Sequence, residues 1–154
     1  MMDAEKDDLI FLEDRLNEWL FKIRITPNMK GYAILKDIVL QLVFESWKKG
    51  NFNKLIYPPL AEKYKISVSQ IERRLKTVCE ICKRKSSESD LSFLFGSLNI
   101  DTLSVKQVVC SLAERLKIEY RAMQHQKGVN FSANDDFDFF IMKKQQLEKK
   151  NAQN

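Results

Sequence analysis

The sequence predicts an all-α fold, and three features of the chain indicate this class. Glycine and proline are scarce, with four and three residues in a chain of 154. The alternation of Val, Ile and Thr with polar residues that marks β-strands hardly occurs. Apolar residues instead recur at spacings of three and four, as they do along one side of a helix. We therefore expect about six helices, including a helix-turn-helix, and a candidate tail helix.

Helix-breaking and capping residues set the bounds of the expected helices. The first helix ends before Ile25-Thr26-Pro27, because a residue that precedes proline is disfavoured in the helical conformation. The second helix has an apolar stripe that continues to Trp47 and is wide enough for a central, buried helix. Gly50 is expected to end this helix, because glycine is favoured just after the C-terminus of a helix. Ser104 can cap the last helix. The expected helices cover residues 7–23, 32–49, 57–64, 67–85, 90–96 and 104–123.

The third and fourth of these helices form a predicted helix-turn-helix. Tyr57-Pro58-Pro59 opens a short helix, because proline is tolerated where the first-turn N–H has no partner inside the helix. Lys65-Ile66 is a tight connection, and Ser67 with Gln70 has the pattern of a capping box. The second helix of such a unit can lie in the major groove of DNA, although helical hairpins also serve as inert scaffolding.

The helix that begins at Ser67 is amphipathic. Its apolar residues, expected to be buried, are Val68, Ile71, Leu75, Val78, Cys79 and Cys82. Its outward residues are Ser69, Glu72, Arg73 and Lys76, with Gln70 at the margin. On periodicity alone this outward face is either a surface that meets a partner or an ordinary solvated face.

Charge is distributed unevenly along the chain. Lys48 to Lys85 contains eleven Lys and Arg residues against three Glu, whereas Met1 to Asp14 contains six acidic residues and one Lys. Concentrated positive charge is the electrostatic footprint of a polyanionic partner, because Lys and Arg that neutralise phosphates release condensed counterions. Basic charge also merely solubilises many proteins, so the segment alone does not identify the partner.

Several classes of protein are disfavoured by the sequence. No apolar run approaches the length that crosses a bilayer, and the acidic N-terminus lacks the features of a secretory signal. We therefore expect a cytoplasmic protein with reduced cysteines and no membrane partner. The chain has no glycine-rich phosphate loop, nucleophile elbow or paired catalytic carboxylates. We expect neither an enzyme nor a bound cofactor.

Cys79 and Cys82 have the C-x-x-C spacing of redox and zinc motifs. Both fall on the apolar side of a helix, and Cys110 and His125 are the only other soft ligands. Structural zinc sites need four convergent ligands, so we interpret these cysteines as core thiols and expect no metal site. His125 lies in a Gln-Lys stretch and is interpreted as a surface residue rather than a general base.

Five segments of the chain match one known family in order and in spacing. They are MKGYAILKDIV (Met29 to Val39), KLIYPPLAEKY (Lys54 to Tyr64), SVSQIERRLKTVCE (Ser67 to Glu80), LFG (Leu94 to Gly96) and LAERLKIEY (Leu112 to Tyr120). Together they resemble the C-terminal effector domain of the stage zero sporulation protein A family, response regulators that govern endospore formation. The resemblance covers roughly Leu16 to Tyr120.

This resemblance implies an all-helical domain that binds a short DNA box through its helix-turn-helix, usually as paired copies on adjacent sites. The Glu-Arg pair of the family's recognition helix falls on Glu72 and Arg73, and a second base-reading arginine is matched by Lys76. Arg is bidentate to guanine O6 and N7, Lys contacts the same acceptors, and Glu can accept from cytosine N4. The resemblance therefore assigns the helix that begins at Ser67 as the reading helix.

The chain departs from the family pattern at three places. We expect no receiver domain, with its phosphoacceptor aspartate, in this chain, so phosphorylation-controlled dimerisation is not carried over. The loop Ser97 to Thr102 reads SLNIDT and lacks the lysines that the family has before its last helix. Lys76 stands where the family has an arginine, and a lysine lacks the planar, bidentate geometry of arginine. The preferred base, or the discrimination between bases, is therefore expected to change.

We expect an acidic leader and the start of the first helix over residues 1–14, a helix-turn-helix effector domain over 15–124 and a polar and aromatic C-terminal extension over 125–154. The expected function is sequence-specific binding of double-stranded DNA to regulate transcription, with a homodimer on DNA and RNA polymerase or a related regulator as further partners. The alternative is a protein-interaction module that antagonises or heterodimerises with a full-length regulator. Residues expected to read bases are Glu72, Arg73 and Lys76; those expected to contact phosphates are Lys63, Lys65, Ser69, Gln70 and Arg74.

The C-terminal extension has apolar residues at the spacing of an amphipathic helix. Its apolar positions include Phe137, Phe140, Ile141 and Leu147, and three aspartates precede or interrupt them. Such a helix either packs on its own domain or places its acidic, aromatic front on the Arg73/Lys76 face or on a partner such as polymerase.

Overall fold

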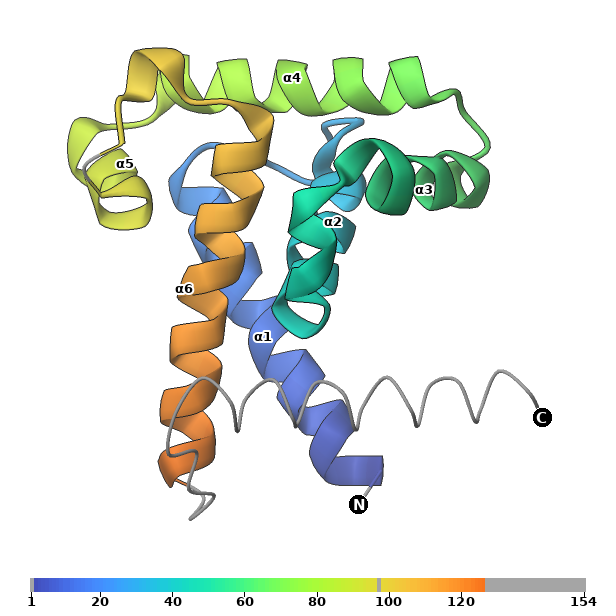
Figure 1. Ribbon diagram of the computed structural model, residues 1–154. Coiled ribbons are helices and arrows are strands. Elements are labelled where there is room, and N and C mark those ends of the chain that lie inside the picture. The colour runs from blue at the N-terminus through green and yellow to red at the C-terminus, as the bar shows by residue number, and fades with distance from the viewer. Residues whose placement is uncertain (1, 97, 127–154) are drawn as a thin grey trace. The chain divides into compact units, whose positions relative to one another are not determined.

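The computed structural model describes residues 2–96 and 98–126 and confirms the all-α class (Figure 1). The described residues form six α-helices and contain no strand: α1 (Met2–Lys22), α2 (Tyr32–Phe44), α3 (Tyr57–Tyr64), α4 (Val68–Lys85), α5 (Glu88–Phe95) and α6 (Val105–Gln126). Two short helical turns, η1 (Ser46–Gly50) and η2 (Phe52–Ile56), lie between α2 and α3, and a third, η3 (Ile100–Thr102), lies between α5 and α6. No helix among these residues has the length and apolar character of a membrane span. The predicted tail helix lies outside the described residues.

Contacts along the chain divide it into two units, Met1–Leu116 and Lys117–Asn154. The first unit contains α1 to α5 and the first half of α6. It also contains the whole helix-turn-helix. The described part of the second unit is the C-terminal end of α6, in which Tyr120 is buried and Ile118 is 59% exposed.

α2 is the central helix of the first unit. It contacts α1, α4 and η1. Its buried side chains are Ile34, Leu35, Ile38, Val39, Leu42 and Val43. Burying aliphatic side chains on this scale is the main favourable term in the stability of a small helical domain. The prediction of a central, buried helix is thus confirmed for residues 32–44.

The predicted end of this helix was wrong. The α-helix ends at Phe44, Glu45 has a non-helical φ of −132°, and the chain continues as the 3₁₀ turn η1. This change of helical phase moves Trp47 off the apolar stripe, and its side chain is 58% exposed. The π-helical turn η2 follows, capped by the side chain of Asn51, which accepts a hydrogen bond from the Lys54 N–H (3.2 Å).

Serine residues cap the last two helices of the first unit. Ser87 caps α5 by accepting from the Asp90 N–H at 3.2 Å, and the helix begins at Glu88, two residues before the predicted start. Ser104 begins α6, as predicted: its Oγ accepts from the Gln107 N–H, and the Gln107 side chain accepts from the Ser104 N–H. Each serine satisfies a backbone donor that has no partner inside its helix.

Candidate nucleic-acid interface

The helix-turn-helix is formed by α3 and α4, which pack against each other at the N-terminal end of α4 (Figure 1). Lys65 ends α3 in the left-handed conformation, with φ 56° and ψ 44°, and its N–H donates to the carbonyls of Ala61 and Glu62. A left-handed residue at this place satisfies the last carbonyls of a helix and reverses the chain. The turn therefore directs Ser67 to the start of α4.

A capping box fixes the first turn of α4. The Gln70 N–H donates to Ser67 Oγ at 3.1 Å, and the Ser67 N–H donates to Gln70 Oε1 at 3.0 Å. The start predicted from these two residues is confirmed. The side-chain oxygen of Gln70 is used in the cap, so its NH₂ group is the part available for a phosphate.

We expect Ser67→Ala to lower the free energy of unfolding by about 1 kcal/mol, because the Gln70 N–H loses its acceptor. Urea denaturation measures this change. Ser69→Ala is the matched control, because Ser69 is exposed in the same turn and alanine favours a helix. Equal stability of the two variants would contradict the role of the cap.

The two sides of α4 differ as the periodicity predicts. Five of the six expected apolar residues are buried: Ile71, Leu75, Val78, Cys79 and Cys82. The sixth, Val68, is half-buried. The outward residues Ser69, Glu72, Arg73 and Lys76 are exposed, and Gln70 is half-buried. The structure thus brings the three expected base-reading side chains onto the accessible side of one helix.

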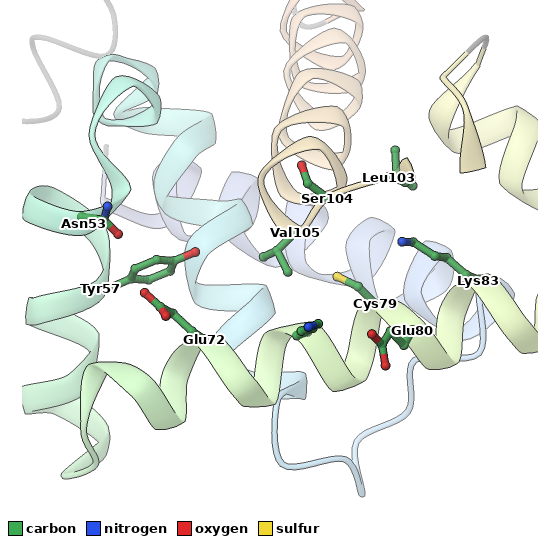
Figure 2. A pocket seen from close by; sticks show the side chains of 10 residues that line it. Asn53, Tyr57, Glu72, Cys79, Glu80, Lys83, Leu103, Ser104 and Val105 are labelled. Carbon is green, nitrogen blue, oxygen red and sulfur yellow. The ribbon is translucent and has the colours of Figure 1, made fainter. Parts of the chain in front are cut away.

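A hollow of about 440 Å³ lies on one flank of α4 (Figure 2). It is lined by Asn53, Tyr57, Glu72, Lys76, Cys79, Glu80, Lys83, Leu103, Ser104 and Val105. Figure 2 shows the Glu72 side chain directed toward Tyr57. Burial and the nearby Glu72 carboxylate raise the pKa of the Tyr57 hydroxyl. This flank carries both signs of charge, because Glu72 and Glu80 lie among the lysines.

A second hollow, of about 430 Å³, lies on the opposite flank of α4. It is lined by Met29, Lys30, Gly31, Gln70, Arg73, Arg74, Thr77, Val78 and Ile81. Among the described residues that line it, Lys30, Arg73 and Arg74 are cationic and none is acidic. The two flanks of the helix therefore differ in charge.

The residues expected to contact phosphates have unequal surroundings. Lys63 Nζ forms an ion pair with Asp37 Oδ2 at 2.8 Å, and the Tyr64 hydroxyl donates to the same oxygen at 2.5 Å. Burial, followed by this carboxylate, raises the pKa of Tyr64 above its usual range. Lys65 is exposed and Arg74 half-buried, and neither takes part in an ion pair among the described residues. Asp37 thus partly neutralises Lys63 but not these two.

Cys79 and Cys82 are buried free thiols. The structure supports their interpretation as core residues, and the described part of the chain holds no group of three or more side chains that could bind a metal. Burial raises the pKa of Cys79 to about 12 and that of Cys82 to about 11, from an ordinary value of 9.0. Both are neutral thiols in the folded protein at neutral pH.

These raised pKa values predict a loss of stability in alkali. Between about pH 9 and pH 11 the unfolded chain loses the thiol protons while the folded protein retains them, so the free energy of unfolding falls as pH rises. We expect a decrease of roughly 1–2 kcal/mol between about pH 8 and pH 9.5, measured by urea denaturation. A Cys79→Ala/Cys82→Ala variant should show a smaller decrease. An equal decrease in both proteins would assign the effect to other groups.

The fold and the exposed side of α4 define a helix-turn-helix domain. The chain matches the family described as Sporulation initiation factor Spo0A C terminal over residues 16–114, which is more than half of its length. The chain belongs to this family, as its five matching segments led us to expect. The family consists of DNA-binding regulatory domains of sporulation rather than enzymes, which gives the chain a general role in DNA binding and transcription regulation.

Proposed function

We propose that the chain binds double-stranded DNA in a sequence-specific manner and regulates transcription by inserting the N-terminal half of α4 into the major groove. The observation that carries this proposal is the exposure of Glu72, Arg73 and Lys76 on a helix whose opposite side is buried. A helix held in this way presents its outward side chains from a fixed backbone, which direct readout requires. Family membership supports the same role.

Each of the three side chains has a chemical partner at the base edges. Arg73 can donate two parallel hydrogen bonds to O6 and N7 of a guanine, and Lys76 can donate to the same kind of acceptor. Glu72 can accept from N4 of a cytosine. Lys65, Ser69 and the other expected phosphate contacts would hold the helix in register, and a second copy on an adjacent site would add affinity.

The test is a fluorescence-anisotropy titration of duplexes that contain either a family-like box or a randomised sequence, at two salt concentrations. Arg73→Ala should lose about 1–3 kcal/mol of binding free energy on the preferred box and little on the randomised duplex. Arg84→Ala is the matched control, because Arg84 is exposed near the C-terminal end of the same helix.

Two results would count against the proposal. If every duplex is bound equally weakly, and Arg73→Ala does not change this binding, the chain does not read DNA sequence through α4. No binding of any duplex, together with mixed dimers formed with a full-length regulator, would favour a protein-interaction module.

A further inference from the structure

The loop between α1 and α2 lies outside the helix-turn-helix, yet three of its residues, Met29 to Gly31, line the cationic hollow beside α4. We propose that Lys30 in this loop contacts a phosphate of the DNA backbone and that Lys30 and Arg74 together hold the strand on that flank. This inference rests on the proposed function of α4 as the reading helix. Lys30 was not among the residues that the sequence pattern assigned to DNA.

Gly31 is the reason that the loop reaches α4. A Cβ atom at this position would lie 2.5 Å from Val78 Cγ2 and 2.7 Å from the backbone oxygen of Arg74. Only a residue without a side chain permits so close an approach. Lys30 is therefore adjacent in the chain to a residue that touches the backbone of α4 at Arg74.

Backbone hydrogen bonds make this loop a series of turns. The Met29 N–H donates to the Thr26 carbonyl at 3.0 Å, and the Tyr32 N–H donates to the Met29 carbonyl at 3.1 Å. The Gly31 carbonyl then accepts from the Leu35 N–H at 2.9 Å, which joins the loop to the first turn of α2. The backbone of Lys30 is thus fixed relative to both α2 and α4, so this cation is presented from a defined position.

The charges around Lys30 favour an anion. None of the ion pairs in the described part of the chain involves Lys30, Arg73 or Arg74. Other lysines of the same unit, such as Lys36 with Glu13 at 3.3 Å, do have acidic partners. Three cations around one hollow with no carboxylate in its lining form a site of positive potential.

The position of the hollow identifies the anion as a backbone phosphate. When a helix lies in the major groove, its outermost side chains face base edges and its two flanks face the two sugar-phosphate strands. Lys30 and Arg74 lie on one flank of α4, beside the base-reading residue Arg73. A cation there positions the helix without reading sequence.

The experiment compares Lys30→Gln with Lys6→Gln in the full chain. Both variants replace one exposed lysine and remove one positive charge, but Lys6 lies near the N-terminal end of α1. Affinities for the preferred and the randomised duplex are measured by anisotropy at several salt concentrations. We expect Lys30→Gln to weaken both complexes by roughly threefold to tenfold and to reduce the salt slope by about 0.9. Lys6→Gln should leave the slope unchanged, and Lys30→Arg should restore it.

The possible results separate this inference from the proposed function. A salt slope and an affinity that do not change in Lys30→Gln, while Arg73→Ala still loses specific binding, would overturn the phosphate contact alone. A loss confined to the preferred duplex would also overturn it, because that result indicates base readout. Absence of DNA binding by the unaltered chain would overturn both proposals. The unfolding free energy of Lys30→Gln, expected to be unchanged, confirms that a lower affinity does not arise from unfolding.

Discussion

Replacing Gly31 with alanine is expected to lower the free energy of unfolding by about 1–3 kcal/mol. The φ of Gly31 is −87°, which any residue adopts, so the cost does not come from backbone conformation. It comes from collision, because the new Cβ would lie 2.5 Å from Val78 Cγ2 and 2.7 Å from the Arg74 oxygen. A backbone oxygen inside a helix cannot move unless the helix moves, so the loop and α4 must separate.

Gly50→Ala is the matched control for this substitution. A Cβ at Gly50 has no neighbour within 4 Å. We expect its free energy of unfolding to lie within about 0.5 kcal/mol of the unaltered protein, or to rise slightly because alanine restricts the unfolded chain. Both variants are compared by urea denaturation. Equal stability of the two variants would show that the approach of the loop to α4 is not essential.

A second substitution separates the two collisions at Gly31. Val78→Ala removes the Cγ2 methyl group but leaves the Arg74 oxygen in place. A double variant, Gly31→Ala/Val78→Ala, should therefore recover only part of the loss in a double-mutant cycle. Full recovery would assign the whole effect to the valine side chain.

The start and the buried side of α4 could be predicted from sequence because both depend on residues close together in the chain. Ser67 and Gln70 are three residues apart, and their reciprocal hydrogen bonds form within one helical turn. The buried stripe follows from helical geometry alone. Local interactions of this kind are independent of the rest of the fold.

Other features depend on contacts that the sequence pattern does not contain. Trp47 continues the spacing of the α2 stripe, but the chain leaves the α-helix at Glu45 and turns the indole outward. Leu9 also fits its helical stripe but is 40% exposed. Periodicity gives the direction of a side chain within a helix, and the extent of the neighbouring elements decides whether that direction is buried.

The candidate site shows the same limit. The exposure of Glu72, Arg73 and Lys76 follows from the helical period of α4. The ion pair of Lys63 with Asp37 joins residues that are far apart in the chain. Lys30 reaches the site through a glycine contact between a loop and α4. Contacts between distant segments could not be inferred from spacing, although the glycine next to Lys30 was the local sign of a close approach.

Leu75→Ala is expected to have the largest effect on stability, a loss of about 2–5 kcal/mol. Leu75 is fully buried, on the side of α4 opposite its outward residues. Truncation removes apolar contacts and leaves a cavity, because neighbouring side chains relax only in part. Leu9→Ala is the matched control: it makes the same chemical change in a helix at a residue that is 40% exposed. A difference of less than about 1 kcal/mol between the two variants would show that α4 does not depend on its buried side.

The same variant tests whether core and interface can be separated. At a temperature well below its unfolding transition, Leu75→Ala should retain most of its affinity for the preferred duplex, because none of the outward side chains is altered. Its melting temperature should nevertheless fall, and bound DNA should raise that temperature roughly with the logarithm of the DNA concentration above the Kd. A loss of affinity in a fully folded Leu75→Ala protein would mean that readout depends on how tightly α4 is held. In that case the packing beneath the helix contributes to recognition itself, through the precision with which it positions Arg73.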